Sequence, residues 1–137
     1  MRLRNVFLLS VVLVFAVCSS IHAQNRCSIE FVGYVWNGPD LTLQARVYND
    51  VGYTLYGCVC QAVYQGTAST PPYTCPTWCK DDETYRTIPV NGSILVDITC
   101  DMTGYNCAWY YIGFWDECGP SGAIEYCYYE VDCTSYP

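Results

Sequence analysis

The side chains of this sequence that are best suited to acid–base chemistry are carboxylates. They gather in three places: Asp81-Asp82-Glu83, Asp116-Glu117, and a C-terminal group of Glu125, Glu130 and Asp132. Two carboxylates held about 5–10 Å apart across a cleft can hydrolyse a glycosidic bond. A small domain with short loops offers little room for such a cleft. We therefore expect these residues to form solvated acidic surface.

The single histidine, His22, lies in a segment that we expect to be removed. Histidine is the usual base near neutral pH, so its loss excludes Ser-His-Asp and Cys-His catalysis in the mature chain. No glycine-rich phosphate loop is present either. The sequence therefore predicts a protein that is not an enzyme and needs no cofactor.

Residues 1–23 have the three-part layout of a secretory signal peptide. Basic residues open the chain, an apolar run follows over residues 6–17, and cleavage is predicted after Ala23. The alternative is a membrane anchor, but a run of 12 residues is shorter than the roughly 20 that a span needs. We expect a secreted protein in which residues 24–137 form one domain.

Cysteine is unusually abundant, with 11 copies in 137 residues. Only Cys18 lies in the predicted signal, so ten cysteines remain after cleavage. An even number of cysteines in an exported chain indicates that they pair, here as five disulfides. The cysteine spacings do not match a zinc ribbon, and the carboxylates lack the spacing of an EF-hand, so no metal site is predicted. The ten cysteines expected in bridges are Cys27, Cys58, Cys60, Cys75, Cys79, Cys100, Cys107, Cys118, Cys127 and Cys133.

The pairing of these cysteines is only partly constrained by their spacing. Cys58 and Cys60 lie two apart on a predicted strand and face the same side, so we expect them to bond different partners. Cys75 and Cys79 are the nearest candidates. A bridge between Cys100 and Cys107 would close the turn between them. The remaining four, Cys27, Cys118, Cys127 and Cys133, would then pair among themselves.

Aromatic residues are in surplus, with 14 Tyr and 4 Trp. A domain of this size cannot bury them all. If the stretch Cys107–Trp115 is a strand, both of its faces carry apolar residues, so the sequence does not say which face meets the core. Exposed Tyr and Trp mark binding surfaces, and Tyr34 and Trp36 are further candidates. The residues expected to form such a surface are Trp109, Tyr111, Trp115, Tyr126 and Tyr128.

Asn91-Gly92-Ser93 is an acceptor motif for N-glycosylation in a predicted exposed turn. The alternative is that Asn-Gly is simply a favourable turn. In a secreted eukaryotic protein, we expect a glycan on Asn91.

Alternating apolar and polar residues predict short strands rather than helices. In the first strand, Cys27, Ile29, Phe31 and Val35 are expected on one face. Thr67–Lys80 is expected to be an irregular loop. Turn residues separate the strands, which favours an antiparallel β-sandwich of about seven strands. The expected strands cover Cys27–Val35, Leu41–Val47, Tyr53–Tyr64, Thr84–Ile88, Ile94–Cys100, Cys107–Trp115 and Ile124–Cys133.

The segments LTLQARVYNDVG, IPVNGSILVDITC and YYIGFWDECGPSGAIEYCYYEVDC follow one another in an order that resembles immunoglobulin-like adhesion modules, such as the bacterial cell-adhesion-related (CARDB) domains. The pattern covers most of residues 41–133, and the cysteines depart from it. The resemblance implies an immunoglobulin-like sandwich and an extracellular role in adhesion or spacing. It assigns no functional residue.

The net charge of -7 argues against nucleic acid as a partner. Two hypotheses for function follow. The first is an extracellular structural or adhesion module that presents aromatic surface to copies of itself, in a fibre, coat or matrix, or to another protein. The second is a small carbohydrate-binding protein whose aromatic side chains stack on sugars.

Overall fold

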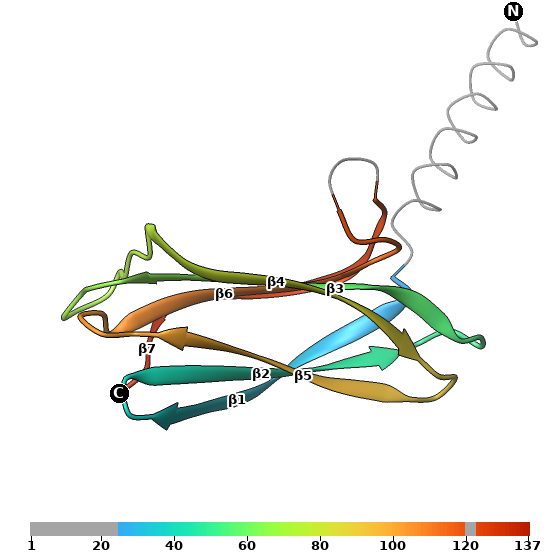
Figure 1. The fold of residues 1–137 in the computed structure, drawn as a ribbon, viewed down its shortest axis with the longest axis horizontal. Coiled ribbons are helices and arrows are strands. Elements are labelled where there is room, and N and C mark those ends of the chain that lie inside the picture. Colours follow the sequence, from blue (N-terminus) through green and yellow to red (C-terminus); the bar gives the residue numbers. More distant parts are fainter. Residues whose placement is uncertain (1–24, 120–122) are drawn as a thin grey trace, which may run out of the picture.

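The computed structural model describes residues 25–119 and 123–137 (Figure 1). These residues contain no helix, and thus none that could cross a membrane. The predicted signal peptide lies outside them. They form seven antiparallel strands: β1 (Cys27–Asn37), β2 (Asp40–Asn49), β3 (Leu55–Gly66), β4 (Thr77–Ile88), β5 (Ser93–Asp101), β6 (Cys107–Trp115) and β7 (Glu125–Ser135).

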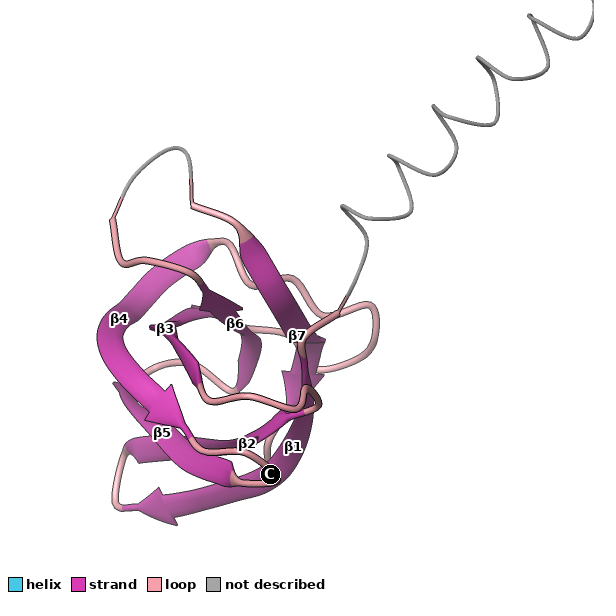
Figure 2. Ribbon diagram, turned by 90° about the vertical axis from the view of Figure 1, so that its right-hand side faces the viewer, coloured by secondary structure: helices cyan, strands magenta, loops and turns pink. Residues whose placement is uncertain are grey.

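The strands pack as two sheets, in the orders β1-β2-β5 and β4-β3-β6-β7, with the core between them (Figure 2). The predicted all-β antiparallel sandwich of about seven strands is therefore confirmed. β2 shows why the pattern worked, because its buried and half-exposed residues alternate without a break. Leu41, Leu43, Ala45 and Val47 face inward and are fully buried.

In the second half of β1, the prediction of which side chains face the core is wrong. A bulge between Phe31 and Gly33 inserts one residue, and Gly33 adopts a φ of 151°. One extra residue reverses the side on which every later side chain lies. Val35 pairs with Thr42 and faces outward, whereas Trp36 packs against the core.

β4 begins at Thr77, within the segment Thr67–Lys80 that was predicted to be a loop, and extends well beyond the short strand expected at Thr84–Ile88. The cause is its place at the edge of a sheet. Nearly all of its residues are exposed, so they carry no apolar alternation. Charged residues on an edge strand also hinder pairing with another chain.

Among residues 25–119 and 123–137, four disulfides form rather than the five expected: Cys27–Cys127, Cys58–Cys118, Cys75–Cys133 and Cys79–Cys100. The pairings expected of Cys58 and Cys60 with Cys75 and Cys79, and of Cys100 with Cys107, are wrong. Cys60 and Cys107 keep free thiols. On β3, Cys60 lies six residues from the partner of Cys107, about 20 Å along the strand. This separation is too long for a disulfide.

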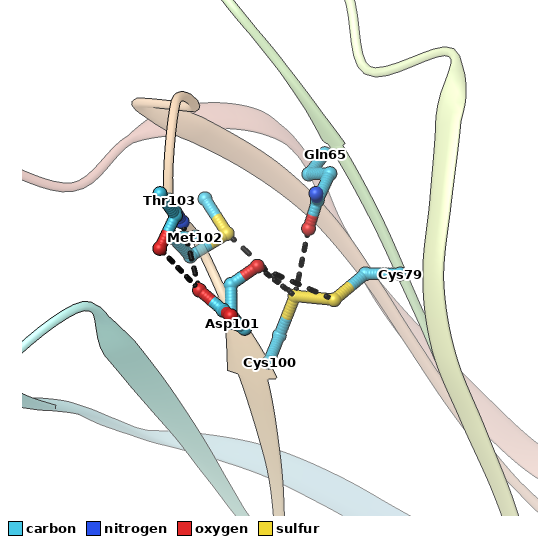
Figure 3. Close-up of a disulfide and its surroundings, with 6 residues drawn as sticks. All are labelled: Gln65, Cys79, Cys100, Asp101, Met102 and Thr103. Atoms are coloured by element: carbon cyan, nitrogen blue, oxygen red, sulfur yellow. Dashed lines mark hydrogen bonds between the residues drawn. A yellow bond between two sulfur atoms is a disulfide. The ribbon is translucent and has the colours of Figure 1, made fainter.

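Two of the bridges close the sides of the sandwich. β4 lies beside β5, and Cys79 reaches from β4 to Cys100 at the end of β5 (Figure 3). The amide oxygen of Gln65 lies 2.9 Å from Cys100 Sγ. β1 lies beside β7 on the opposite side, and Cys27–Cys127 joins them. The two sheets are thus covalently linked at both edges.

Candidate functional site: an aromatic surface on the four-stranded sheet

The outer surface of the four-stranded sheet carries a continuous group of aromatic side chains, which we call the aromatic face. The register of β3, β6 and β7 brings them together. For example, Tyr64 on β3 lies opposite Trp109 on β6, and Tyr128 on β7 lies opposite Gly113. The aromatic face consists of Tyr64, Trp109, Tyr111, Trp115 and Tyr128.

The rings of the aromatic face contact one another in sequence. Tyr64 meets Trp109 edge-on, with ring centroids 5.5 Å apart. Trp109 stacks with Tyr111 at 6.1 Å, and Tyr111 stacks with Tyr128 at 6.3 Å. These distances lie in the range of favourable aromatic pairs. Tyr128 remains 59% exposed, so the stack is accessible from solvent.

The structure shows which face of β6 packs against the core. Tyr110, Ile112 and Phe114 are fully buried, so Trp109, Tyr111 and Trp115 face outward. Tyr110 is satisfied inside the core because its hydroxyl donates to Gln61 Oε1 at 2.6 Å. The amide of Gln61 in turn donates to the carbonyl oxygen of Asp97 at 3.0 Å. This buried network fixes the facing of the strand.

Tyr126 does not lie with the other predicted surface residues. The register of β7 shifts beside Phe114 and Trp115, and Tyr126 occupies the extra position. Its ring packs against Phe114 at 5.9 Å, with the guanidinium carbon of Arg26 4.6 Å from the ring centroid. The expectation that Tyr126 shares a face with Tyr128 is therefore wrong.

Tyr34 and Trp36, which the sequence suggested as further members, also lie elsewhere. Both are on β1 of the other sheet. Tyr34 packs edge-on against Tyr136 with centroids 4.8 Å apart, and Trp36 packs against the core. Neither extends the aromatic face.

Beside the stack lies an open pocket of about 320 Å³, lined by Cys60, Glu83, Tyr111, Trp115, Glu117, Gly119 and Ala123. Gly113 makes room for two of the rings that form it. A Cβ added to Gly113 would lie 2.5 Å from Tyr111 Oη and 2.7 Å from Trp115 Nε1. An added side chain at position 113 would therefore displace both Tyr111 and Trp115 from their places over the strand.

The second feature of the pocket is its negative charge. Glu83 and Glu117 line it, and Glu125 accepts a hydrogen bond of 2.7 Å from the Tyr111 hydroxyl. Burial raises the pKa of Tyr111, and the bond to Glu125 raises it further. Burial also raises the pKa of Cys60 to about 11, with smaller contributions from Glu83, Asp82 and Glu125. The Cys60 thiol is thus protonated at neutral pH and is a poor nucleophile.

The basic side chains of the described residues lie away from this pocket. Arg26 covers Tyr126, and Arg46 donates to Ser93 at 3.2 Å on the other sheet. Lys80 and Arg86 line hollows between β4 and β5, where Asp82 and Asp97 also lie. The carboxylates of the pocket therefore have no cationic partner among the described residues.

Sequence reasoning missed two residues of this site, Tyr64 on β3 and Gly113 on β6, because no local pattern marks them. It singled out Glu83 and Glu117 as carboxylates but expected only solvated acidic surface, because their position beside Tyr111 and Trp115 depends on how distant segments pack. Among the described residues, no cluster of three or more possible metal ligands is present.

Asn91 lies at an exposed turn between β4 and β5 with a φ of 58°. This left-handed conformation suits asparagine or glycine. The position is accessible to a glycosylating enzyme, and glycosylation stays a prediction.

Comparison with known proteins found no matching family model and no matching curated protein. Among solved structures, the chain is similar to the β-glucosidase DesR from Streptomyces venezuelae, with 11% identity and a TM-score of 0.45 over 79% of this chain. β-Glucosidase 3B from Thermotoga neapolitana has 13% identity and a TM-score of 0.41 over 78% of this chain.

This chain spans only 15% and 16% of those two proteins. CsgH from R. palustris has 16% identity and a TM-score of 0.40, with 73% of this chain and 86% of that chain covered. At these low TM-scores, none of the three similarities bears on function.

Proposed function

We propose that this chain is a secreted, non-enzymatic module that binds an extracellular partner, or further copies of itself, through the aromatic face. The observation that supports this most strongly is the accessible stack from Tyr64 through Trp109 and Tyr111 to Tyr128. Tyr and Trp are enriched at the centres of interfaces because they bury a large area at a low entropic cost.

Two further observations support a rigid extracellular role. Four disulfides hold a small sandwich, and such bridges persist in oxidising compartments. A surface held rigidly loses little entropy on binding. The case against catalysis rests on the described residues, which lack histidine and whose two free thiols are either protonated or buried.

Size-exclusion chromatography with light scattering tests self-association over a range of concentrations. If the partner is a second copy, the wild-type protein forms oligomers, and Trp109→Ala forms fewer; if it is another protein, the wild-type protein captures it and Trp109→Ala captures less. Gln44→Ala on the three-stranded sheet is the control and is expected to behave as wild type. A strict monomer that also captures no extracellular partner would contradict the proposal.

A second candidate function is carbohydrate binding. It is favoured by the pocket, where the rings of Tyr111 and Trp115 lie beside Glu83 and Glu117. An aromatic ring can stack on a sugar face while carboxylates accept hydrogen bonds from its hydroxyls. A glycan array tests this idea with wild type and Trp115→Ala. Binding that is lost in the variant supports it, and an empty array removes it.

A further inference from the structure

The pocket beside Gly113 combines two chemical features, aromatic rings and carboxylates. It presents the rings of Tyr111 and Trp115, and it presents the carboxylates of Glu83 and Glu117, with Glu125 close behind Tyr111. The basic side chains of the described residues lie elsewhere, so these carboxylates have no cationic partner among them.

We propose that this pocket receives an arginine side chain from a basic segment of a protein partner. The inference rests on the proposed function and narrows it, because it names the chemistry of the partner. A guanidinium group stacks on aromatic rings through cation–π attraction. Its planar set of donors also matches the two oxygens of a carboxylate.

The dimensions and charge of the pocket favour this occupant. A volume of about 320 Å³ is at the lower end of the range for ligand pockets and suits one side chain. The chain as a whole carries a charge of -7, so a basic partner is attracted and an anionic one is repelled. The Cys60 thiol at the pocket wall feels the same negative field, which contributes to its raised pKa.

A second copy of this chain fits the pocket less well than a basic partner. The copy carries the same negative charge. Its Arg26 lies over Tyr126 and its Arg46 bonds to Ser93, so docking either arginine would first break an existing contact. Its Arg86 lines a hollow between β4 and β5 that Asp82 and Asp97 also line. The charge pattern therefore favours a partner of different sequence.

The experiment is a titration of the disulfide-intact protein with a nonapeptide containing three arginines, monitored through the indole N–H signals of Trp109 and Trp115 by NMR. The matched probe is the same peptide with citrulline, which keeps the shape and removes the charge. We expect the arginine peptide to shift the Trp115 signal and to bind about tenfold more tightly than the citrulline peptide. Added salt should weaken binding of the arginine peptide.

Two charge-matched variants locate the effect. Glu83→Gln removes a carboxylate of the pocket, and Glu30→Gln removes one on the opposite sheet, where Gln can still accept the hydrogen bond from Tyr48. We expect only Glu83→Gln to weaken binding of the arginine peptide. Both positions are exposed, so both variants should fold, and circular dichroism checks this.

The outcomes separate this inference from the proposed function. Equal binding of the two peptides, equal weakening by both variants, or no binding of the arginine peptide would overturn the arginine pocket. If self-association or glycan binding that depends on Trp109 or Trp115 then persists, the proposed function stands without it. If every one of these assays is negative, both fail.

Discussion

The two outer faces of the sandwich are built on the same strand geometry and differ in the chemistry of their central side chains. On the three-stranded sheet, polar side chains satisfy one another. The hydroxyl of Tyr48 donates to Glu30 at 2.8 Å, the Thr42 and Thr99 hydroxyls are 2.8 Å apart, and Arg46 donates to Ser93 at 3.2 Å. On the four-stranded sheet, stacked rings and unpaired carboxylates face solvent.

The difference shows that the chemistry of an outer face can vary while the core follows the same rule. The inner residues of both sheets follow one rule, which is burial of apolar side chains. The outer residues do not pack in the core and therefore need not be apolar. On the three-stranded sheet, hydrogen bonds link the outer polar groups named above, whereas Glu83 and Glu117 on the four-stranded sheet have no cationic partner among the described residues.

The disulfides follow the same division. Cys58–Cys118 and Cys75–Cys133 both belong to the four-stranded sheet and its adjoining loops, whereas no bridge lies within the three-stranded sheet. Cys118 also lies between Glu117 and Gly119, which line the pocket. The covalent reinforcement is therefore concentrated on the face that we propose to bind.

The largest expected effect comes from removing that reinforcement. The double variant Cys58→Ala/Cys118→Ala should lower the free energy of unfolding by about 2–5 kcal/mol, measured by urea denaturation under non-reducing conditions. It should also weaken binding at the pocket, since Cys118 anchors its rim. Cys60→Ser is the control, because that cysteine forms no bridge. A double variant as stable as wild type would show that the bridge does not stabilise this face.

The next largest effect concerns thiol reactivity. Because the pKa of Cys60 is raised from 9.0 to about 11, its thiolate is scarce at pH 8, and alkylation should be about 100-fold slower than for an ordinary thiol. The rate should increase with pH up to about 11, because deprotonation produces the reactive form. Mass spectrometry of the peptide containing Cys60 measures this rate.

The control for Cys60 is the variant Gln44→Cys in a Cys60→Ser background, which places a thiol on the outer face of the three-stranded sheet. Its alkylation rate should level off near pH 9. If the alkylation rates of the two thiols depend on pH in the same way, the proposed difference between the surroundings of Cys60 and those of the three-stranded sheet is wrong.

Gly113→Ala should cost about 1–3 kcal/mol of stability, as overpacking commonly does. The new methyl group would collide with Tyr111 and Trp115 and push them out of the pocket wall. Urea denaturation and the Trp115 indole signal report both effects. Gly52→Ala serves as control because no heavy atom lies within 4 Å of the added Cβ. Equal stability of the two variants would refute the close approach at Gly113.

The smallest effect compares two Tyr–Glu hydrogen bonds, one on each face. Tyr111→Phe removes a half-buried bond to Glu125 and should cost about 1 kcal/mol. Tyr48→Phe removes an exposed bond to Glu30 and should cost nothing measurable, because water replaces it. Ultraviolet titration adds a second readout, since Tyr111→Phe should remove a tyrosine whose pKa is raised by burial. Equal losses would show that burial does not distinguish the faces.

Local patterns predicted much of the fold and part of the site. The alternation of Leu41, Leu43, Ala45 and Val47 is a property of neighbouring residues, so the strand and its inner face follow directly from it. Trp109, Tyr111 and Trp115 are spaced by even numbers and share a face for the same reason. β4 was partly missed because an exposed edge strand has no apolar period to recognise.

Amino-acid order alone established an all-β chain rich in cysteine, with aromatic residues on both sides of β6. Long-range packing then settled which side is exposed, by burying Tyr110 and bonding it to Gln61. It also settled that Cys58 meets Cys118, that Tyr126 turns away at a bulge, and that Glu83 comes to lie beside Trp115. Such features depend on strand register and on bulges, because a shift of one residue moves every later side chain to the other side of the sheet. The register is determined by contacts with residues that are distant along the chain.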